Sequence, residues 1–250
     1  MPLLRFFPAV CCGLLALLIT TGCSTATGTG PAEEGKTPWQ AGAMVTAANP
    51  HAVDAAMDVL RAGGHAVDAA IAAHAVLGLV EPQSSGLGGG AFMMVYQRDQ
   101  DSLVFHDGRE VAPAAATPDM FMRDGEAMGF MAAWQGGVSI GVPGVVALYE
   151  DTHRQYGKLP LATLLQPAID LARDGFEVSP RMAAFLPRIA ELGRLDENPG
   201  AAAYFYPQGK PLQVGHVLKN PEYAATLSRI AAEGSPAFYQ GAVAEAMVAQ

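Results

Sequence analysis

A single arginine at the end of an apolar stretch is the residue best suited to bind a substrate. Arg109 stands in the run Asp107-Gly108-Arg109-Glu110, and a loop rich in proline and alanine follows it. A guanidinium is always charged and presents a planar fork of N–H donors, which suits bidentate binding of a carboxylate. The flanking carboxylates of Asp107 and Glu110 are expected to hold that fork in orientation. The sequence therefore predicts that Arg109 binds a carboxylate of the substrate.

A glycine-rich loop, Gly86-Leu87-Gly88-Gly89-Gly90-Ala91, is the second feature. Its letters fit the dinucleotide pattern G-x-G-x-x-G/A, but that pattern works between a strand and the start of a helix. Here a predicted helix precedes the loop and a predicted strand follows it, which argues against a nucleotide. Two compatible interpretations remain open. The glycines permit positive φ angles and close backbone packing, or their N–H groups line an anion or oxyanion site.

Serine and histidine side chains give weaker signals. Ser84 and Ser85 precede the glycines without the G-x-S-x-G elbow, so we interpret them as turn or cap serines. The six histidines form no H-E-x-x-H or similar ligand pair, and we expect no metal site. His74 lies within an apolar helix and is interpreted as a core residue. His106 is close to Arg109 in sequence and is a weaker candidate for a supporting residue.

Two helices precede the glycine loop. Asn49-Pro50 supplies an N-cap and a first-turn proline, apolar residues follow at helical spacing, and Gly63-Gly64 ends the helix. The second helix, over 66–80, is apolar nearly all round, which is typical of a helix in the middle of a fold.

A β-hairpin is predicted to follow the glycine loop. Its strands cover 91–97 and 102–105 and are joined by a polar turn. Shorter strands are predicted at 43–47 and 137–142. Beyond Gly144 the pattern predicts helices, over residues 144–156, 161–174, 180–191, 221–233 and 236–249. This order favours a mixed α/β (α+β layered) fold in which a sheet lies against packed helices.

Residues 1–22 are typical of a secretory signal, with a charged start followed by the apolar run Phe6–Ile19. The run Ile19-Thr20-Thr21-Gly22-Cys23 is similar to a bacterial lipobox, so Cys23 is expected to carry lipid. Cleaved secretion without lipid and an uncleaved anchor are the alternatives. Residues 23–39 are interpreted as a flexible linker. The protein is thus expected to be exported, periplasmic and tethered to the membrane through its lipid.

Composition limits the class of protein. Half of the 250 residues are hydrophobic and 16% are charged, which permits a sizeable folded core. The formal net charge of -9, without a Lys/Arg block, argues against a nucleic-acid partner. Because Cys11 and Cys12 lie in the signal segment, an internal disulfide is not expected in the mature chain.

Several ordered motifs resemble the large-subunit half of the γ-glutamyltransferases (γ-glutamyltranspeptidases). The resemblance covers nearly everything from about Gln40 to Gln250, and the domain is therefore expected to span 40–250. The motifs are AVDAAIA at 66–72, EPQSSGLGGGAF at 81–92, DGRE at 107–110 with APA at 112–114, GVPG at 141–144, QPAI at 166–169 and AFYQG at 237–241. The resemblance implies the fold of the N-terminal nucleophile hydrolases, a four-layer αββα sandwich, here incomplete and with a helix-rich second half.

The resemblance also implies an activity. Members of the family cleave γ-glutamyl amides such as glutathione through a γ-glutamyl-enzyme, and pass the acyl group to water or to an amino acid or peptide. No cofactor is needed. The family's arginine in this motif matches Arg109 and binds the α-carboxylate of the glutamyl group. The nucleophile is the amino-terminal threonine of a small subunit released from the same precursor. We expect that threonine downstream of Gln250, and no catalytic residue within the chain.

Two other functions remain open. One is a related acylase that acts on cephalosporin side chains, for which a carboxylate-binding arginine would also serve. The other is a lipid-anchored protein that binds γ-glutamyl compounds without catalysis. Activity on glutathione compared with a glutaryl-cephalosporin separates the two enzymes, and a threonine at a processing junction separates the enzymes from the binding protein.

We expect the 250-residue chain alone neither to cleave itself nor to turn over substrate, because it holds no counterpart of the threonine nucleophile. The measurement is release of p-nitroaniline from γ-glutamyl-p-nitroanilide by the purified chain. Release above the no-enzyme background would contradict this expectation.

Overall fold

The computed structural model describes residues 42–249. The chain divides into two units, Met1–Gly42 and Ala43–Gln250, and the fold described below belongs to the second. The expected signal segment, the lipidation site Cys23 and the linker up to residue 39 lie outside the described residues.

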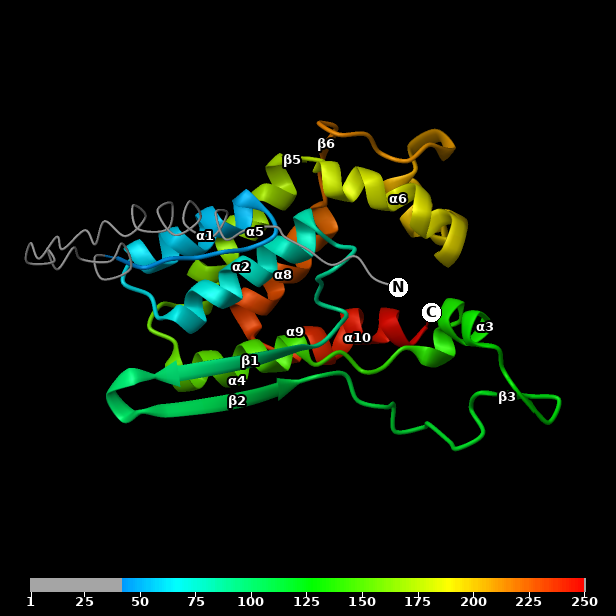
Figure 1. The fold of residues 1–250 in the computed structure, drawn as a ribbon, viewed down its shortest axis with the longest axis horizontal. Coiled ribbons are helices and arrows are strands. Elements are labelled where there is room, and N and C mark those ends of the chain that lie inside the picture. Colours follow the sequence, from blue (N-terminus) through cyan, green and yellow to red (C-terminus); the bar gives the residue numbers. More distant parts are fainter. Residues whose placement is uncertain (1–41, 250) are drawn as a thin grey trace, which may run out of the picture. The chain divides into compact units, whose positions relative to one another are not determined.

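Four helices form the core of this unit (Figure 1). They are α1 (Pro50–Arg61), α2 (Ala66–Val80), α5 (Leu161–Asp174) and α8 (Pro221–Glu233). Helix α2 packs against both α1 and α5, and α5 packs against α8. Ile71 and Val76 of α2 are fully buried, because apolar side chains on every face of a helix are removed from water only when neighbours surround it. The predicted central place of this helix is confirmed.

The helix ends follow from their capping residues. Asn49 caps α1, because its Oδ1 accepts a hydrogen bond of 3.1 Å from the N–H of His51 and Pro50 occupies the first helical position. At the start of α2, the buried carboxylate of Asp68 accepts bonds from the N–H groups of His65 (2.8 Å) and Lys158 (2.9 Å). Asp68 therefore joins α2 to the chain just before α5.

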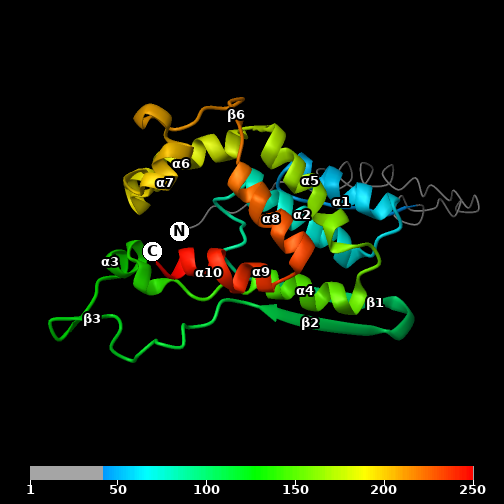
Figure 2. The same cartoon turned by 180° about the vertical axis from the view of Figure 1, so that it is seen from behind.

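The predicted hairpin consists of β1 (Ala91–Gln97) and β2 (Ser102–Gly108), paired antiparallel. The polar turn between them is a short 3-10 segment, Arg98–Gln100. Strand β2 runs to Gly108, beyond the predicted end at 105, because Gly108 pairs with Ala91. The hairpin lies along α4 (Val145–Tyr156), as Figures 1 and 2 show from opposite sides.

The two faces of the hairpin differ in burial. Val95, His106 and Gly108 are buried on the side that faces the helices. Large apolar side chains on the other face are exposed, namely Phe92, Met94, Tyr96, Leu103 and Phe105. This alternation is the period-2 pattern of a strand pair with one covered face.

Two predicted strands are wrong. Residues 43–47 form no strand, because no strand lies beside them within the described residues, and Val45 and Ala47 pack against the helical core instead. In 137–142, Gly137–Ser139 forms a 3-10 turn, and Val142 makes an isolated bridge with Val111.

The helical second half is largely confirmed. Helices α4, α5, α6 (Pro180–Gly193) and α8 lie within two residues of their predicted bounds. The helix predicted over 236–249 is two helices, α9 (Pro236–Tyr239) and α10 (Gly241–Val248), because Gln240 is extended and Gly241 has a φ of 65°. The pattern did not predict these short elements: β3 (Met122–Arg123), β4 (Glu126–Ala127), α3 (Phe130–Gln135), β5 (Phe176–Glu177), α7 (Pro199–Phe205) and β6 (Val217–Leu218). Within residues 42–249, no helix has the length and apolar character needed to cross a bilayer.

A buried polar pair connects the first two helices. The Nδ2 of Asn49 donates a hydrogen bond of 2.9 Å to Oε1 of Glu81, the residue that follows the last residue of α2. Both residues are at least 95% buried. Because Asn49 accepts at its oxygen as a helix cap and donates at its nitrogen to a carboxylate, an ionised aspartate, which only accepts, cannot replace both bonds.

Asn49→Asp is expected to lower the free energy of unfolding by about 3 kcal/mol, because it places a second carboxylate against buried Glu81 while it preserves the cap. The measurement is urea denaturation followed by circular dichroism. The matched control is Asn198→Asp at the exposed N-cap of α7, which we expect to change the free energy by less than about 0.5 kcal/mol. Equal effects of the two substitutions would show that the Asn49–Glu81 contact is unimportant.

Candidate carboxylate-binding site

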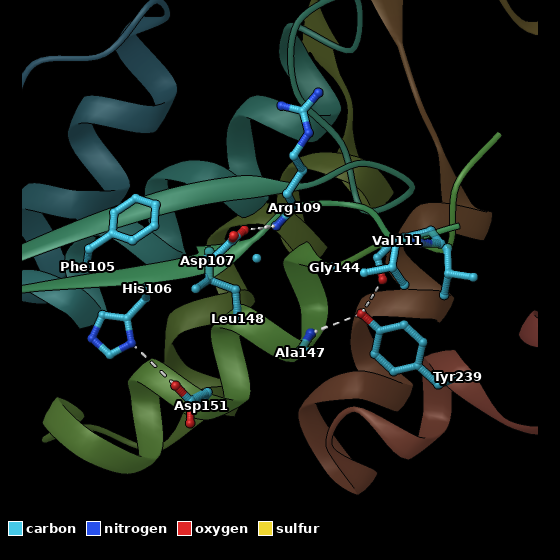
Figure 3. Close-up of a pocket in the computed structure, with 13 residues that line it drawn as sticks. Phe105, His106, Asp107, Arg109, Val111, Gly144, Ala147, Leu148, Asp151 and Tyr239 are labelled. Atoms are coloured by element: carbon cyan, nitrogen blue, oxygen red, sulfur yellow. Dashed lines mark hydrogen bonds and ion pairs between the residues drawn. The ribbon is translucent and has the colours of Figure 1, made fainter. Parts of the chain in front are cut away.

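The structure places Arg109 directly after the end of β2, on the surface. Its backbone N–H donates a hydrogen bond of 2.9 Å to Oδ1 of Asp107. Its guanidinium carbon lies 6.0 Å from the centre of the Phe92 ring, which permits a cation–π contact. Figure 3 shows the side chain extending away from the His106–Asp151 pair and from Tyr239.

The guanidinium of Arg109 has no ion-pair partner among residues 42–249. We expected Asp107 and Glu110 to hold the guanidinium in orientation, and this is wrong for Asp107, whose carboxylate holds the Arg109 backbone instead. Glu110 makes no ion pair with Arg109 either; its carboxylate lies beside the glycine loop, near Gly89 and Gly90. The fork of N–H donors is therefore available to an external carboxylate.

Three glycines hold the backbone on which Arg109 stands. A Cβ on Gly90 would lie 2.7 Å from the Gly108 carbonyl oxygen and 2.8 Å from the Arg109 Cα, and a Cβ on Gly144 would lie 2.7 Å from the Arg109 carbonyl oxygen. Gly108 itself faces Leu148 of α4, where a Cβ would lie 2.6 Å from the Leu148 Cβ. Real side chains do not approach this closely, so the three positions require glycine. We call Gly90, Gly108 and Gly144 the glycine clamp.

The glycine loop is also bonded to α4. The carbonyl oxygen of Gly89 accepts hydrogen bonds from the N–H groups of Gly144 (3.1 Å) and Val145 (3.2 Å). These donors belong to the first turn of α4, where N–H groups have no partner within the helix. The close-packing interpretation of the glycines is therefore supported at Gly90, and the alternative of an oxyanion site stays a prediction.

Arg109 borders two hollows of the surface. One has a volume of about 600 Å³ and lies between the end of β2, α4 and Tyr239 (Figure 3). The other, of about 530 Å³, lies against the segments 110–113 and 138–141. A third hollow of about 410 Å³ is lined by the glycine loop, His74 and Glu110. Arg109 therefore contributes to the lining of the first two hollows.

His106 and Tyr239 hold the elements around the site together through contacts with α4 and with the segment before it. His106 is buried, with its Nδ1 3.4 Å from Oδ2 of Asp151 and its Nε2 3.2 Å from the Tyr156 hydroxyl, so it fastens β2 to α4. The Tyr239 hydroxyl donates to the Pro143 carbonyl (2.8 Å) and accepts from the N–H of Ala147 (3.1 Å). Burial raises the pKa of Tyr239, which keeps this hydroxyl protonated. His106 thus supports the strand and does not touch the Arg109 guanidinium.

His74 is half-buried, as expected for a histidine that faces the core, and its Nδ1 lies 2.5 Å from the Tyr149 hydroxyl. Burial lowers the pKa of His74 and raises the pKa of Tyr149, so both groups are neutral at pH 7. Within residues 42–249, no group of three or more His, Cys, Asp or Glu side chains is placed to hold a metal ion.

The sequence did not predict the roles of several residues that build the site. Gly144 and Tyr239 stand in the GVPG and AFYQG motifs. No local pattern shows, however, that Gly144 packs against the Gly108–Arg109 backbone or that the Tyr239 hydroxyl binds the Pro143 carbonyl. The buried carboxylate of Glu81 and its partner Arg181 were missed for the same reason. A charged residue between the apolar helix 66–80 and the glycine loop was a usable signal, because a carboxylate beside a core helix requires a partner.

Gly144→Ala and Gly90→Ala are each expected to lower the free energy of unfolding by about 2 kcal/mol, because a methyl group overlaps the Gly108–Arg109 backbone. The control is Gly88→Ala in the same loop, where a Cβ meets nothing within 4 Å; we expect it to change stability by less than about 0.5 kcal/mol. Urea denaturation measures all three. Variants at Gly90 and Gly144 as stable as the Gly88 variant would contradict the clamp.

Known proteins are similar to this chain over most of its length. The profile of the Gamma-glutamyltranspeptidase family matches residues 52–250. Glutathione hydrolase 3 of Arabidopsis thaliana is 40% identical over 190 residues, which cover 76% of this chain and 29% of the plant protein. The chain therefore spans less than a third of that relative.

Solved structures of similar proteins superimpose on most of this chain. The Helicobacter pylori gamma-glutamyltranspeptidase superimposes with a TM-score of 0.77 and 33% identity, covering 82% of this chain and 58% of that chain. A cephalosporin acylase from Bacillus halodurans superimposes with a TM-score of 0.68 and 30% identity, covering 80% and 38%. The mixed helix-and-strand fold of an incomplete N-terminal nucleophile hydrolase is confirmed. The chain belongs to the gamma-glutamyltranspeptidase family.

Proposed function

We propose that this chain is the carboxylate-binding part of a γ-glutamyltransferase (glutathione hydrolase). In this proposal Arg109 binds the α-carboxylate of a γ-glutamyl donor such as glutathione. Acceptors are water, amino acids or peptides. No cofactor takes part, and no nucleic acid is a partner.

The proposal rests on the surroundings of Arg109. Its backbone is fixed by the glycine clamp and by Asp107, whereas its guanidinium has no ion-pair partner within the described residues. A charged fork held in position without an internal partner is suited to bind a carboxylate through two parallel hydrogen bonds. Each charge-assisted bond contributes roughly 1.5–3 kcal/mol.

The reaction needs a nucleophile that none of the described residues supplies. We propose that it is the amino-terminal threonine of a small subunit made from the same precursor. Its hydroxyl adds to the γ-carbonyl, the C–N bond of the amide breaks, and the amine leaves with a proton. Water or an acceptor amine then cleaves the resulting ester and regenerates the threonine. Arg109 holds the donor in place during both steps and takes no part in bond breaking.

The exposed face of the hairpin supports the need for such a partner. Phe92, Met94 and Phe105 are each more than half exposed, and they lie beside one another across β1 and β2. A contiguous apolar face of this kind is typical of a surface that another polypeptide covers. We propose that the small subunit covers it.

We further propose that the protein is exported and held at the membrane on the periplasmic side by lipid on Cys23. The sequence of residues 1–23 supports this. Mass spectrometry of the mature protein tests it, because lipidation adds a diacylglyceryl group to the new first residue.

A cephalosporin-type acylase is the second candidate. The likeness to the Bacillus halodurans acylase favours it, and a glutaryl side chain carries a terminal carboxylate that Arg109 can bind in the same way. Turnover of a glutaryl-cephalosporin without turnover of glutathione would select this candidate.

We call the proposed enzyme with both its subunits the active protein. Arg109→Lys in the active protein is expected to raise KM for glutathione at least about tenfold, because a point charge replaces a bidentate fork. The change in kcat is expected to be small, and self-cleavage into two subunits should continue. Steady-state kinetics and gel electrophoresis measure these. The control is Arg98→Lys in the hairpin turn, at the opposite end of the two strands from Gly90 and Gly108, and it should leave KM unchanged. An unchanged KM for Arg109→Lys would remove this residue from the site.

A further inference from the structure

We propose that Glu81 and Arg181 are positioning residues for Arg109. Their ion pair fixes the first residues of the glycine loop, and the loop in turn holds the Arg109 backbone. This inference rests on the proposed role of Arg109 in substrate binding, and it extends that role to two residues that lie in different parts of the chain.

Glu81 is a charged residue in a buried place. It follows the last residue of α2, and its side chain is 2% exposed. Three donors from separate segments surround the carboxylate: Asn49 donates to Oε1 at 2.9 Å, Gln83 donates to Oε2 at 2.5 Å, and Arg181 lies 3.5 Å from Oε2. A buried carboxylate is tolerated only with such partners.

Arg181 connects this carboxylate to the loop. It stands in the first turn of α6, and its side chain is about half exposed. One guanidinium nitrogen faces Glu81, and the other donates a hydrogen bond of 3.0 Å to the Ser84 hydroxyl. The Ser84 N–H also donates to the Glu81 carbonyl oxygen at 3.0 Å. The turn 81–84 is therefore fixed by its own backbone and by a side chain from α6.

The loop carries this constraint to Arg109. After Ser84 it passes through buried Leu87 and reaches Gly89, whose carbonyl oxygen accepts bonds from the first turn of α4. Gly90 then packs against the Gly108–Arg109 backbone without room for a Cβ. The loop is thus fixed at both ends, and we infer that loss of the Ser84 contact loosens the loop as far as Gly90.

A role in geometry explains the ion pair better than a role in stability. Buried ion pairs add little net stability, since desolvation offsets the attraction, and apolar pairs of similar size often stabilise more. A charged pair that is hydrogen-bonded to three further side chains, Asn49, Gln83 and Ser84, does provide a single arrangement of the segments that it joins. Small displacements of a substrate-binding group have large kinetic effects, up to about 100-fold for 1 Å.

Hydrogen exchange of the 250-residue chain tests whether the ion pair fixes the glycine loop and the Arg109 backbone, and it requires no enzyme activity. Glu81→Gln and Arg181→Met are expected to speed exchange at least about fivefold in peptides covering 84–90 and 109–111, with α5 unchanged. The exposed end of the pair makes Arg181→Met compatible with folding. The control is Arg173→Met, which removes exposed ion pairs to Asp170 and Asp174 and should leave both peptides unchanged. Unchanged exchange in the Arg181 variant would overturn the proposal.

Steady-state kinetics of the active protein test whether the ion pair affects substrate binding through Arg109. Glu81→Gln and Arg181→Met are each expected to raise KM for γ-glutamyl-p-nitroanilide about tenfold, with kcat altered less than about threefold. In an Arg109→Met background the same substitutions should raise KM no further, because the group that they position is gone. Equal KM effects in both backgrounds would overturn positioning and leave a purely structural pair. If the wild-type protein has no γ-glutamyl activity, the proposed function fails, whereas the exchange result stands independently.

Discussion

The close contact of three glycines with one stretch of backbone is the constraint on which the site depends. Gly90, Gly108 and Gly144 come from the glycine loop, the end of β2 and the start of α4. Because none has a side chain, the three segments meet at the carbonyl oxygens of Gly108 and Arg109. Arg109 therefore extends from a rigid base, although its own side chain is exposed. A flexible arginine would lose more conformational entropy when it binds a carboxylate.

The rest of the folded unit supports this junction from several directions. Helix α4 is bonded to the glycine loop through Gly89 and to β2 through the buried ring of His106. Tyr239, from the far end of the chain, fastens α9 to the beginning of α4. The apolar helix α2 lies in the core, and Glu81 directly follows it at the start of the segment that leads to the glycine loop. The site is therefore supported by at least three helices, α2, α4 and α9.

The local parts of the fold could be predicted from the sequence, but the long-range contacts could not. The capped helix after Asn49, the apolar helix 66–80 and the hairpin each have a local signal, and all three are confirmed. The strand predicted at 43–47 is wrong because a short apolar stretch does not show whether a partner strand exists. Arg109 was found because its residue type and place suit a carboxylate. Gly144, Tyr239 and Glu81 stand in motifs of the resemblance, and Arg181 stands in none. The roles of all four were not predicted, because these roles depend on neighbours distant in sequence.

The most direct test of the central claim compares two donors that differ by one carboxylate. γ-Glutamyl-p-nitroanilide carries the α-carboxylate, and 4-aminobutyryl-p-nitroanilide lacks it. The active protein should show kcat/KM for the first donor higher by about 100-fold, the value of a bidentate charge-assisted contact, and Arg109→Met should abolish that preference. If the Arg109→Met variant keeps the full preference for the carboxylate-bearing donor, Arg109 does not bind the carboxylate and the account is wrong.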